Sequence, residues 1–259
     1  MAGPADSIHS APRRDERRGV SVVIPALNEE RSIGRVIAAI PPGLVDEVVV
    51  VDNGSIDGTA LAARRAGAVV LSEPRRGYGQ ACLTGIDWLR SPGRRPDILV
   101  FLDADLSDHP EEMPWLLRPI REDRADLVIG SRVLGDSEPG ALLPQARFGN
   151  WLATRLIGWI WGARYTDLGP FRAIRFESLE RLGMKDVNFG WTVEMQVKAA
   201  RHHIRGMEVP VSYRKRIGVS KVTGTVSGTL GAGTKILWTI LVEALKPRRA
   251  GPPGGADRN

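Results

Sequence analysis

A chain of 259 residues is long enough for one α/β domain with a full core or for two small ones. Its single cysteine, Cys82, excludes an internal disulfide framework and a zinc site built from cysteines. The basic excess behind the formal net charge of +6 could serve nucleic acid, anionic lipid headgroups, or solubility alone. No nucleic-acid-binding motif accompanies the charge, so we expect no nucleic-acid partner.

Much of the basic excess lies near the two ends of the chain. Four arginines fall within residues 13–18, and Lys246, Arg248 and Arg249 lie close to the other end. We predict a disordered basic tail over residues 1–19 and a second disordered tail over residues 247–259. The first tail has no apolar run of signal-peptide length, and no run of about 18 apolar residues predicts a membrane-spanning helix. A cytoplasmic protein is therefore expected.

Apolar runs alternate with segments of helical spacing through the first half of the chain. Buried strands are predicted over residues 20–26, 48–51, 68–71, 97–102 and 126–130. Helices are predicted over residues 29–40, from Thr59, over residues 79–89 and from Pro110. This alternation predicts an α/β fold, with a parallel sheet covered by helices on both faces.

Two carboxylates follow the predicted strand at 97–102, in the sequence Asp103-Ala104-Asp105. Oxygen ligands suit Mg²⁺ or Mn²⁺, and Mg²⁺ prefers one or two carboxylates together with substrate phosphates. An ordinary strand-terminal turn is the alternative. Asp52 and Arg132 also follow strands, and ligands bind such sheets at the carboxyl ends of strands. This shared position favours a metal and phosphate site. Asp108 and His109 are expected to cap the helix that follows.

The second half of the chain contains two apolar segments of helical spacing. Residues 148–161 include Trp151, Trp159 and Trp161, and residues 224–245 form the second segment, followed by a basic run. Tryptophans near cationic residues are typical of helices that lie in the plane of a membrane surface. The alternative is packing on the domain or across a homodimer interface. We predict a C-terminal amphipathic helix over residues 226–246.

Ordered motifs extend over about residues 20–225. They are Val22-Val23-Ile24-Pro25-Ala26-Leu27-Asn28-Glu29-Glu30, Val51-Asp52-Asn53-Gly54-Ser55-Ile56-Asp57-Gly58-Thr59, Leu102-Asp103-Ala104-Asp105-Leu106-Ser107-Asp108-His109-Pro110, Gly130-Ser131-Arg132, Asp167-Leu168-Gly169-Pro170-Phe171-Arg172, Glu194-Met195, Val209-Pro210-Val211, Arg216 and Ser220-Lys221. With these motifs the chain resembles the family-2 glycosyltransferases of GT-A fold. Within them it is similar to the minimal, catalytic-domain-only dolichyl- or polyprenyl-phosphate hexose (mannose or glucose) synthases.

The resemblance implies a GT-A catalytic domain over residues 20–225, with a Rossmann-like mixed sheet flanked by helices. It assigns Asp105 as the direct ligand of Mg²⁺ or Mn²⁺, with Asp103 also at the metal and closer to the ribose. The implied nucleotide-sugar-binding residues are Pro25, Leu27, Asn28, Glu29, Asp52, Asn53, Gly54, Asp103, Ala104, Arg216 and Lys221. Arg216 and Lys221 resemble the cations that close over the diphosphate.

The nature of the acceptor decides which other residues the reaction needs. A polyprenyl phosphate is already an anionic nucleophile, so it needs cation contacts rather than a general base. Arg132 resembles the arginine that binds the acceptor phosphate in the synthases, and Arg147 or Arg172 could assist it. A neutral hydroxyl acceptor would need a base, for which Glu194 is the candidate. Glu194 could equally be a structural residue that holds the acceptor loop.

The expected function is metal-dependent, inverting transfer of a hexose from a GDP- or UDP-sugar to a polyprenyl phosphate. The reaction would take place at the cytosolic membrane face, with the protein bound peripherally. The same chemistry on a glycolipid or soluble hydroxyl is the alternative, and a non-catalytic nucleotide-sugar-binding protein is less favoured. A sugar nucleotidyltransferase would need a glycine-rich basic loop after the first strand, where this chain has Pro25-Ala26-Leu27-Asn28-Glu29.

Overall fold

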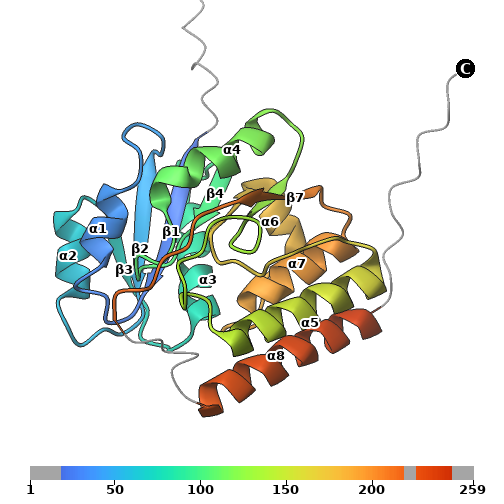
Figure 1. Ribbon diagram of the computed structural model, residues 1–259. Coiled ribbons are helices and arrows are strands. Elements are labelled where there is room, and N and C mark those ends of the chain that lie inside the picture. Colours follow the sequence, from blue (N-terminus) through green and yellow to red (C-terminus); the bar gives the residue numbers. More distant parts are fainter. Residues whose placement is uncertain (1–18, 219–225, 247–259) are drawn as a thin grey trace, which may run out of the picture.

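The computed structural model describes residues 19–218 and 226–246 (Figure 1). Lys221 and nearly all of the two predicted tails lie outside these ranges. Within the last helix, side chains are described from Gly233 onward.

Seven strands form one mixed sheet in the order β3-β2-β1-β4-β6-β5-β7. The strands are β1 Val20–Ala26, β2 Glu47–Asp52, β3 Val69–Ser72, β4 Ile98–Phe101, β5 Leu127–Ser131, β6 Arg172–Arg175 and β7 Gly206–Pro210. Strand β6 is antiparallel to both of its neighbours, whereas the other pairings are parallel. The predicted α/β fold with a mixed sheet is confirmed, and the five predicted strands correspond to β1–β5.

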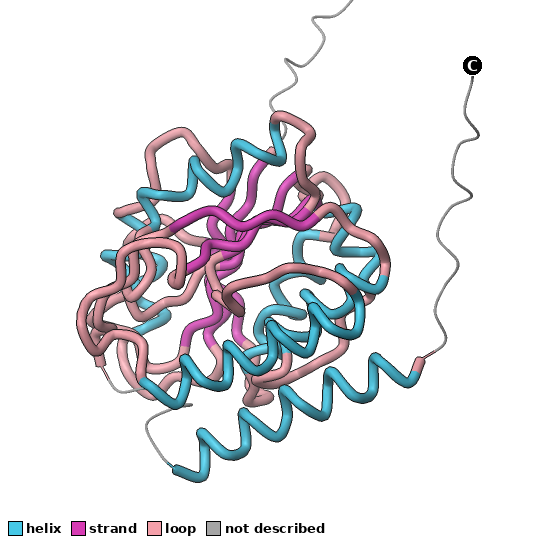
Figure 2. The backbone as a smooth tube through the Cα atoms, turned by 45° about the vertical axis from the view of Figure 1, so that its right-hand side comes forward, coloured by secondary structure: helices cyan, strands magenta, loops and turns pink. Residues whose placement is uncertain are grey.

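Helices cover both faces of this sheet, as the alternation predicted (Figure 2). They are α1 Ile33–Ala38, α2 Thr59–Arg65, α3 Tyr78–Leu89, α4 Met113–Arg121, α5 Pro144–Trp161, α6 Phe176–Leu182, α7 Trp191–Arg201 and α8 Val226–Leu245, with a 3₁₀ turn, η1 Pro110–Glu112, before α4. Apolar residues of α1, α2 and α4 pack on one face of the sheet. Those of α3, α6 and α7 pack on the other, so the sheet is buried between two cores.

A third apolar cluster attaches α5 and α8 to the outside of α7. It contains Ala153 and Ile157 of α5, Val193 and Val197 of α7, and Ile240 of α8. The α5 and α8 helices lie side by side along one side of the molecule in both views (Figures 1 and 2). In the part of the chain that the structure describes, no helix is both long enough and apolar enough to cross a bilayer.

The sequence analysis did not predict β6, which carries an arginine at each end. Arg172, on this strand, has a fully buried side chain. Its guanidinium donates hydrogen bonds to the carbonyl oxygens of Gly169 (3.0 Å), Leu168 (3.1 Å) and Thr192 (3.0 Å). Burial lowers the pKa of Arg172 to about 10. The strand therefore stays inside the sheet because neighbouring backbone, rather than water, satisfies its cation.

The segment 186–190 lies against the first turn of α3. The backbone amide of Gly79 donates to the carbonyl of Asn188 (3.2 Å), and that of Gln80 donates to the carbonyl of Val187 (2.8 Å). These contacts satisfy helix amides that have no partner within the helix. A Cβ atom at residue 79 would lie 2.0 Å from the carbonyl oxygen of Asp186, so the close approach requires glycine.

We predict that Gly79→Ala destabilises the protein by roughly 1–3 kcal/mol, because the added methyl group must displace the backbone of 186–190. Gly34→Ala is the matched control: a Cβ atom there meets nothing within 4 Å, and alanine favours the helix. Urea unfolding of both variants measures the difference. Equal stabilities of the two variants would show that the 186–190 segment shifts at no cost.

Candidate active site

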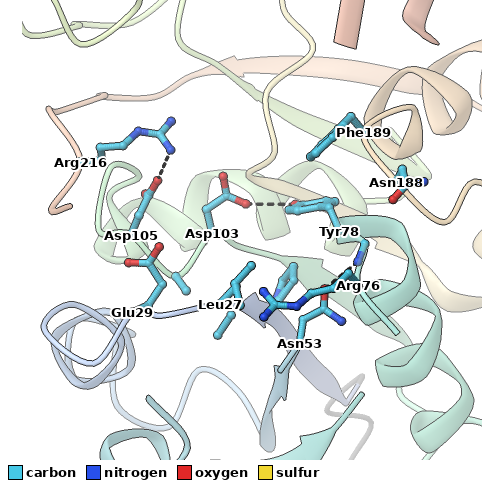
Figure 3. A pocket seen from close by; sticks show the side chains of 14 residues that line it. Leu27, Glu29, Asn53, Arg76, Tyr78, Asp103, Asp105, Asn188, Phe189 and Arg216 are labelled. Carbon is cyan, nitrogen blue, oxygen red and sulfur yellow. Dashed lines mark hydrogen bonds and ion pairs between the residues drawn. The ribbon is translucent and has the colours of Figure 1, made fainter. Parts of the chain in front are cut away.

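A cavity of about 300 Å³ opens at the carboxyl edge of the sheet (Figure 3). Residues from β1, the loops after β1, β2 and β4, the start of α3, the 186–190 segment and the loop before α8 meet there. Its lining residues are Pro25, Ala26, Leu27, Glu29, Asn53, Arg76, Gly77, Tyr78, Asp103, Ala104, Asp105, Asn188, Phe189 and Arg216. Seven of the eleven residues predicted to bind the nucleotide sugar belong to this lining. Another of the eleven, Lys221, lies outside the described ranges.

The two aspartates after β4 have different partners. The Tyr78 hydroxyl donates a hydrogen bond to Asp103 (3.0 Å), while Arg216 forms an ion pair with Oδ2 of Asp105 (2.9 Å). The other oxygen of Asp105 accepts hydrogen bonds from the amide (3.0 Å) and hydroxyl (2.5 Å) of Ser107. Burial and the charge of Asp105 raise the pKa of Asp103 to about 6. Asp103 is thus the carboxylate whose charge is less well compensated.

A third carboxylate, Asp108, is buried beside this pair. Within the described residues, neither of its side-chain oxygens has a hydrogen-bond partner. Burial and the charges of Asp103 and Asp105 raise the pKa of Asp108 well above its ordinary value. The expected capping role is wrong, because the turn at Pro110 has no side-chain cap. The surroundings of Asp108 instead favour a proton or a cation.

These carboxylates fit a divalent cation that shares its ligands with a bound phosphate. Among the residues that the structure describes, no group of three acidic, histidine or cysteine side chains forms a complete metal cage. Asp103 and Asp105 line the same cavity and supply hard oxygen donors. Mg²⁺ is commonly held by one or two carboxylates together with substrate phosphates, so an incomplete protein cage matches this mode of binding.

The predicted donor residues after β1 and β2 fall into two groups. Asn53 lines the cavity, and its side chain also donates to the carbonyls of Glu73 (3.0 Å) and Arg75 (2.7 Å). Asp52, Asn28 and Gly54 do not line the cavity. Asp52 accepts the amide of Ser55 (3.0 Å), and Oδ1 of Asn28 accepts that of Ile56 (2.8 Å). These contacts hold the loops that carry the lining residues.

Six lining residues were not predicted as site residues: Ala26, Arg76, Gly77, Tyr78, Asn188 and Phe189. Arg76 and Tyr78 belong to Arg75-Arg76-Gly77-Tyr78-Gly79, a basic and glycine-containing run just after β3. That pattern at the carboxyl end of a strand was a usable signal. Asn188 and Phe189 come from a segment remote in sequence, and no local pattern marked them.

Arg132, after β5, is fixed by a buried acid. Its Nε and Nη2 atoms donate to the two carboxylate oxygens of Asp167, each at 2.7 Å, and its guanidinium lies 5.0 Å from the Tyr213 ring centroid. Burial works against the charged form, but the ion pair with Asp167 raises the pKa of Arg132 overall. Such a pair of parallel bonds sets the orientation of a guanidinium.

Two further cavities meet at Arg132. One, of about 610 Å³, has among its lining residues Arg132, Arg147, Trp151 and Arg155. The other, of about 280 Å³, is lined by both Arg132 and Arg216. Because Arg216 also lines the first cavity, shared arginines connect the Asp103–Asp105 pair to the large basic cavity.

Two predicted site residues, Glu194 and Arg172, support the structure around the site rather than line a cavity. Glu194 accepts the amides of Lys185 (3.1 Å) and Asp186 (2.8 Å) and pairs with Lys198 (2.7 Å). It lines none of the three cavities and holds the segment that carries Asn188 and Phe189. Arg172 is enclosed by backbone carbonyls, so its predicted contact with an acceptor phosphate is wrong for this conformation.

The fold matches solved structures with bound nucleotides and metal ions. Glucosyl-3-phosphoglycerate synthase from Mycobacterium tuberculosis, in complex with Mn²⁺, uridine diphosphate and phosphoglyceric acid, superposes with a TM-score of 0.70 and 25% sequence identity. The match covers 89% of this chain and 80% of that chain. Another structure of the synthase contains Mg²⁺ and uridine diphosphate. The sheet and its aspartate pair therefore define a glycosyltransferase fold of the GT-A type.

Sequence comparison identifies the family. Residues 21–183 match the model of glycosyl transferase family 2. An uncharacterized glycosyltransferase of Mycobacterium tuberculosis is 39% identical over 218 residues, 82% of this chain and 93% of that protein. The undecaprenyl-phosphate mannosyltransferase of Micrococcus luteus is 33% identical over 233 residues, 81% of this chain and 89% of that protein. The chain belongs to glycosyltransferase family 2 and is a hexosyltransferase that uses a nucleotide sugar.

The raised pKa of Asp103 predicts pH-dependent binding of a metal–nucleotide complex. Below a pH of about 6 a proton occupies Asp103 and competes with the cation, so affinity should rise as the pH increases through this value. Calorimetric titration of Mn²⁺ with a nucleoside diphosphate, from roughly pH 5 to roughly pH 8, measures the effect. An affinity that stays constant over this range would contradict the prediction.

Proposed function

We propose that the enzyme transfers a hexose, with inversion, from a GDP- or UDP-sugar to a polyprenyl phosphate at the cytosolic membrane face. The observation that supports the acceptor most directly is the basic cavity beside Trp151. Arg132, Arg147 and Arg155 line it, and Arg216 connects its neighbour to the donor cavity. An anionic headgroup with an apolar chain suits such a mixture of cations and apolar surface.

Different residues of the donor cavity would bind different parts of a nucleotide diphosphate. Pro25, Leu27 and Asn53 would enclose the base and ribose, and Asp103 and Asp105 would hold a divalent cation against the diphosphate. When bound, the cation stabilises the negative charge that develops on the leaving group. Arg216 lies beside Asp105 in the cavity and supplies a second positive charge there.

The acceptor residues need only bind and orient an anionic oxygen. A phosphate monoester attacks the anomeric carbon without first losing a proton to the enzyme. Arg132 is held by Asp167 through Nε and Nη2, and among the described residues this leaves Nη1 for the incoming phosphate. The carboxylate of Glu194 is engaged by backbone amides and Lys198, and it lies outside the three cavities. We therefore propose no catalytic role for Glu194, which weakens the hydroxyl-acceptor alternative.

A small phosphorylated acceptor is the second candidate. A glucosyl-3-phosphoglycerate synthase of Mycolicibacterium paratuberculosis is 44% identical over 115 residues, although these are 40% of this chain and 33% of that protein. The arginines at the basic cavity would also bind a soluble phosphate. The exposed tryptophan beside them favours the lipid, because a soluble acceptor gains nothing from an apolar wall.

An acceptor assay tests the proposal. Radiolabelled UDP-glucose and GDP-mannose are each incubated with Mn²⁺ and polyprenyl phosphate, phosphoglyceric acid or an alkyl glycoside. We expect product only with polyprenyl phosphate, in the solvent-extractable, mild-acid-labile fraction. Asp105→Ala should lower this transfer by about 100-fold or more, because it removes charge stabilisation at the leaving group. Asp87→Ala, on the exposed side of α3, is the control. Label found only in a water-soluble product would refute the lipid acceptor.

The two arginines of α5 should affect the acceptor alone. We predict that Arg147→Gln and Arg155→Gln each raise the KM for polyprenyl phosphate by roughly tenfold, since a charged hydrogen bond contributes about 1.5–3 kcal/mol. Affinity for the nucleotide should not change. Arg118→Gln, on the exposed face of α4, removes the same charge far from the cavity and serves as the control. Steady-state kinetics with varied acceptor separate these effects. Unchanged KM in both variants would place the acceptor elsewhere.

A further inference from the structure

The α5 and α8 helices expose large apolar side chains along one side of the molecule. On α5 these are Phe148, Trp151 and Trp159, the last of them 86% exposed. On α8 the exposed side chains are Leu237, Trp238, Leu241 and Leu245. Phe148, Trp151 and Trp159 are three and eight residues apart, and Leu237, Leu241 and Leu245 are four apart, with Trp238 directly after Leu237. Each set therefore forms a stripe on its helix. We call the two stripes together the α5–α8 face.

Positive charge and the basic cavity adjoin this face. Arg147 and Arg155 are exposed on α5, and Trp151 belongs both to the face and to the lining of the cavity. Lys246 directly follows α8. An apolar stripe with tryptophan and flanking cations suits an anionic bilayer surface. A second copy of the chain would instead bring like charges together.

One carboxylate connects α8 to the donor cavity. Lys235 of α8 forms an ion pair with Oδ2 of Asp186 (2.9 Å), whose side chain is 6% exposed. Oδ1 of the same carboxylate accepts the amides of Asn188 (2.7 Å) and Gly190 (3.2 Å). Asp186 therefore holds α8 with one oxygen and shapes the 186–190 segment with the other.

The 186–190 segment reaches the donor cavity in two ways. Asn188 and Phe189 line the cavity directly (Figure 3). The carbonyls of the segment also accept the first amides of α3, next to Tyr78, whose hydroxyl binds Asp103. A change in how α8 sits on Asp186 would therefore alter the wall of the cavity and the support of one of its carboxylates.

We propose that the α5–α8 face docks on an anionic lipid bilayer and that the Lys235–Asp186 ion pair couples docking to nucleotide binding. The proposal rests on the proposed function for its membrane location. From residue 233 onward, α8 packs on the domain through Ile236 and Ile240 and exposes its other side, so its packing is a local equilibrium that a bilayer biases. When α8 is packed in this position, Lys235 holds Asp186, and Asp186 in turn holds the 186–190 segment that lines the donor cavity. Coupling of this kind is reciprocal, so bound nucleotide also strengthens docking.

The test measures binding rather than transfer. UDP and GDP, each with Mn²⁺, are titrated into the full chain with vesicles of phosphatidylcholine alone or mixed with phosphatidylglycerol. Anionic vesicles should tighten binding of the nucleotide by about fivefold or more. Vesicle co-sedimentation should increase by the same factor when Mn²⁺ and the nucleotide are present. No effect of vesicles on nucleotide affinity would overturn the proposal.

Lys235 of α8 and Lys246, which directly follows α8, provide a matched pair of variants. Lys235→Met breaks the ion pair with Asp186. Lys246→Met removes the same charge at the end of the helix, where in the described structure Lys246 pairs only with Glu243. Both should bind vesicles equally, but only Lys246→Met should keep the coupling. Asp186→Asn should lose it too, provided that circular dichroism shows a folded protein. Retained coupling in Lys235→Met would refute the role of the ion pair.

Docking itself is tested on the exposed tryptophans. Trp159→Ser and Trp238→Ser should weaken vesicle binding and leave nucleotide affinity in the absence of vesicles unchanged. Unchanged vesicle binding in both variants would refute the docking face. Because these measurements contain no acceptor, a soluble acceptor in the transfer assay would not alter their interpretation. Conversely, absent coupling would leave the lipid-acceptor assay as it stands.

Discussion

Mutual repulsion among three carboxylates at the end of β4 governs the rest of the site. Arg216 compensates Asp105 and Tyr78 donates to Asp103, but the oxygens of Asp108 have no hydrogen-bond partner within the described residues. The raised pKa values of Asp103 and Asp108 express this excess of negative charge. A diphosphate would add to the excess, so it must arrive with a cation. The positive charges of Arg76 and Arg216, which line the cavity, also offset this excess of negative charge.

The donor cavity and the basic cavity proposed for the acceptor are connected through side chains that each belong to two cavities. Arg216 borders the donor cavity and its neighbour, and Arg132 borders that neighbour and the large basic cavity. Each guanidinium is oriented by a carboxylate, Asp105 in one case and Asp167 in the other. Ion pairs of this kind fix direction more than they add stability, since desolvation offsets much of their attraction. The two oriented guanidinium groups can therefore hold two anionic groups near one another without a flexible side chain between them.

Sequence patterns located the carboxyl edge of the sheet but not every side chain that faces the cavity. The β-branched run of β2 predicted a strand ending at Asp52, yet the turn after it points Asn53, rather than Asp52, into the cavity. Arg172 looked like an accessible cation because its buried carbonyl partners come from a loop and from α7. Such partners are set by tertiary packing. Residue type and position in a strand are therefore predictable, whereas orientation at a turn is not.

The reversed direction of β6 has a consequence for how this enzyme can diversify. In a parallel sheet only the loops that leave strands reach the carboxyl edge. Since β6 runs the other way, the loop that enters it reaches that edge and delivers Asp167 to Arg132. Leu168 and Gly169 of this loop are constrained, because their carbonyls hold Arg172 and with it β6 beside β4. The part of the loop before Asp167 has no such tie to the strands that precede Asn53, Asp103 and Asp105. On the proposed function, the acceptor side can then change there while the donor side is maintained.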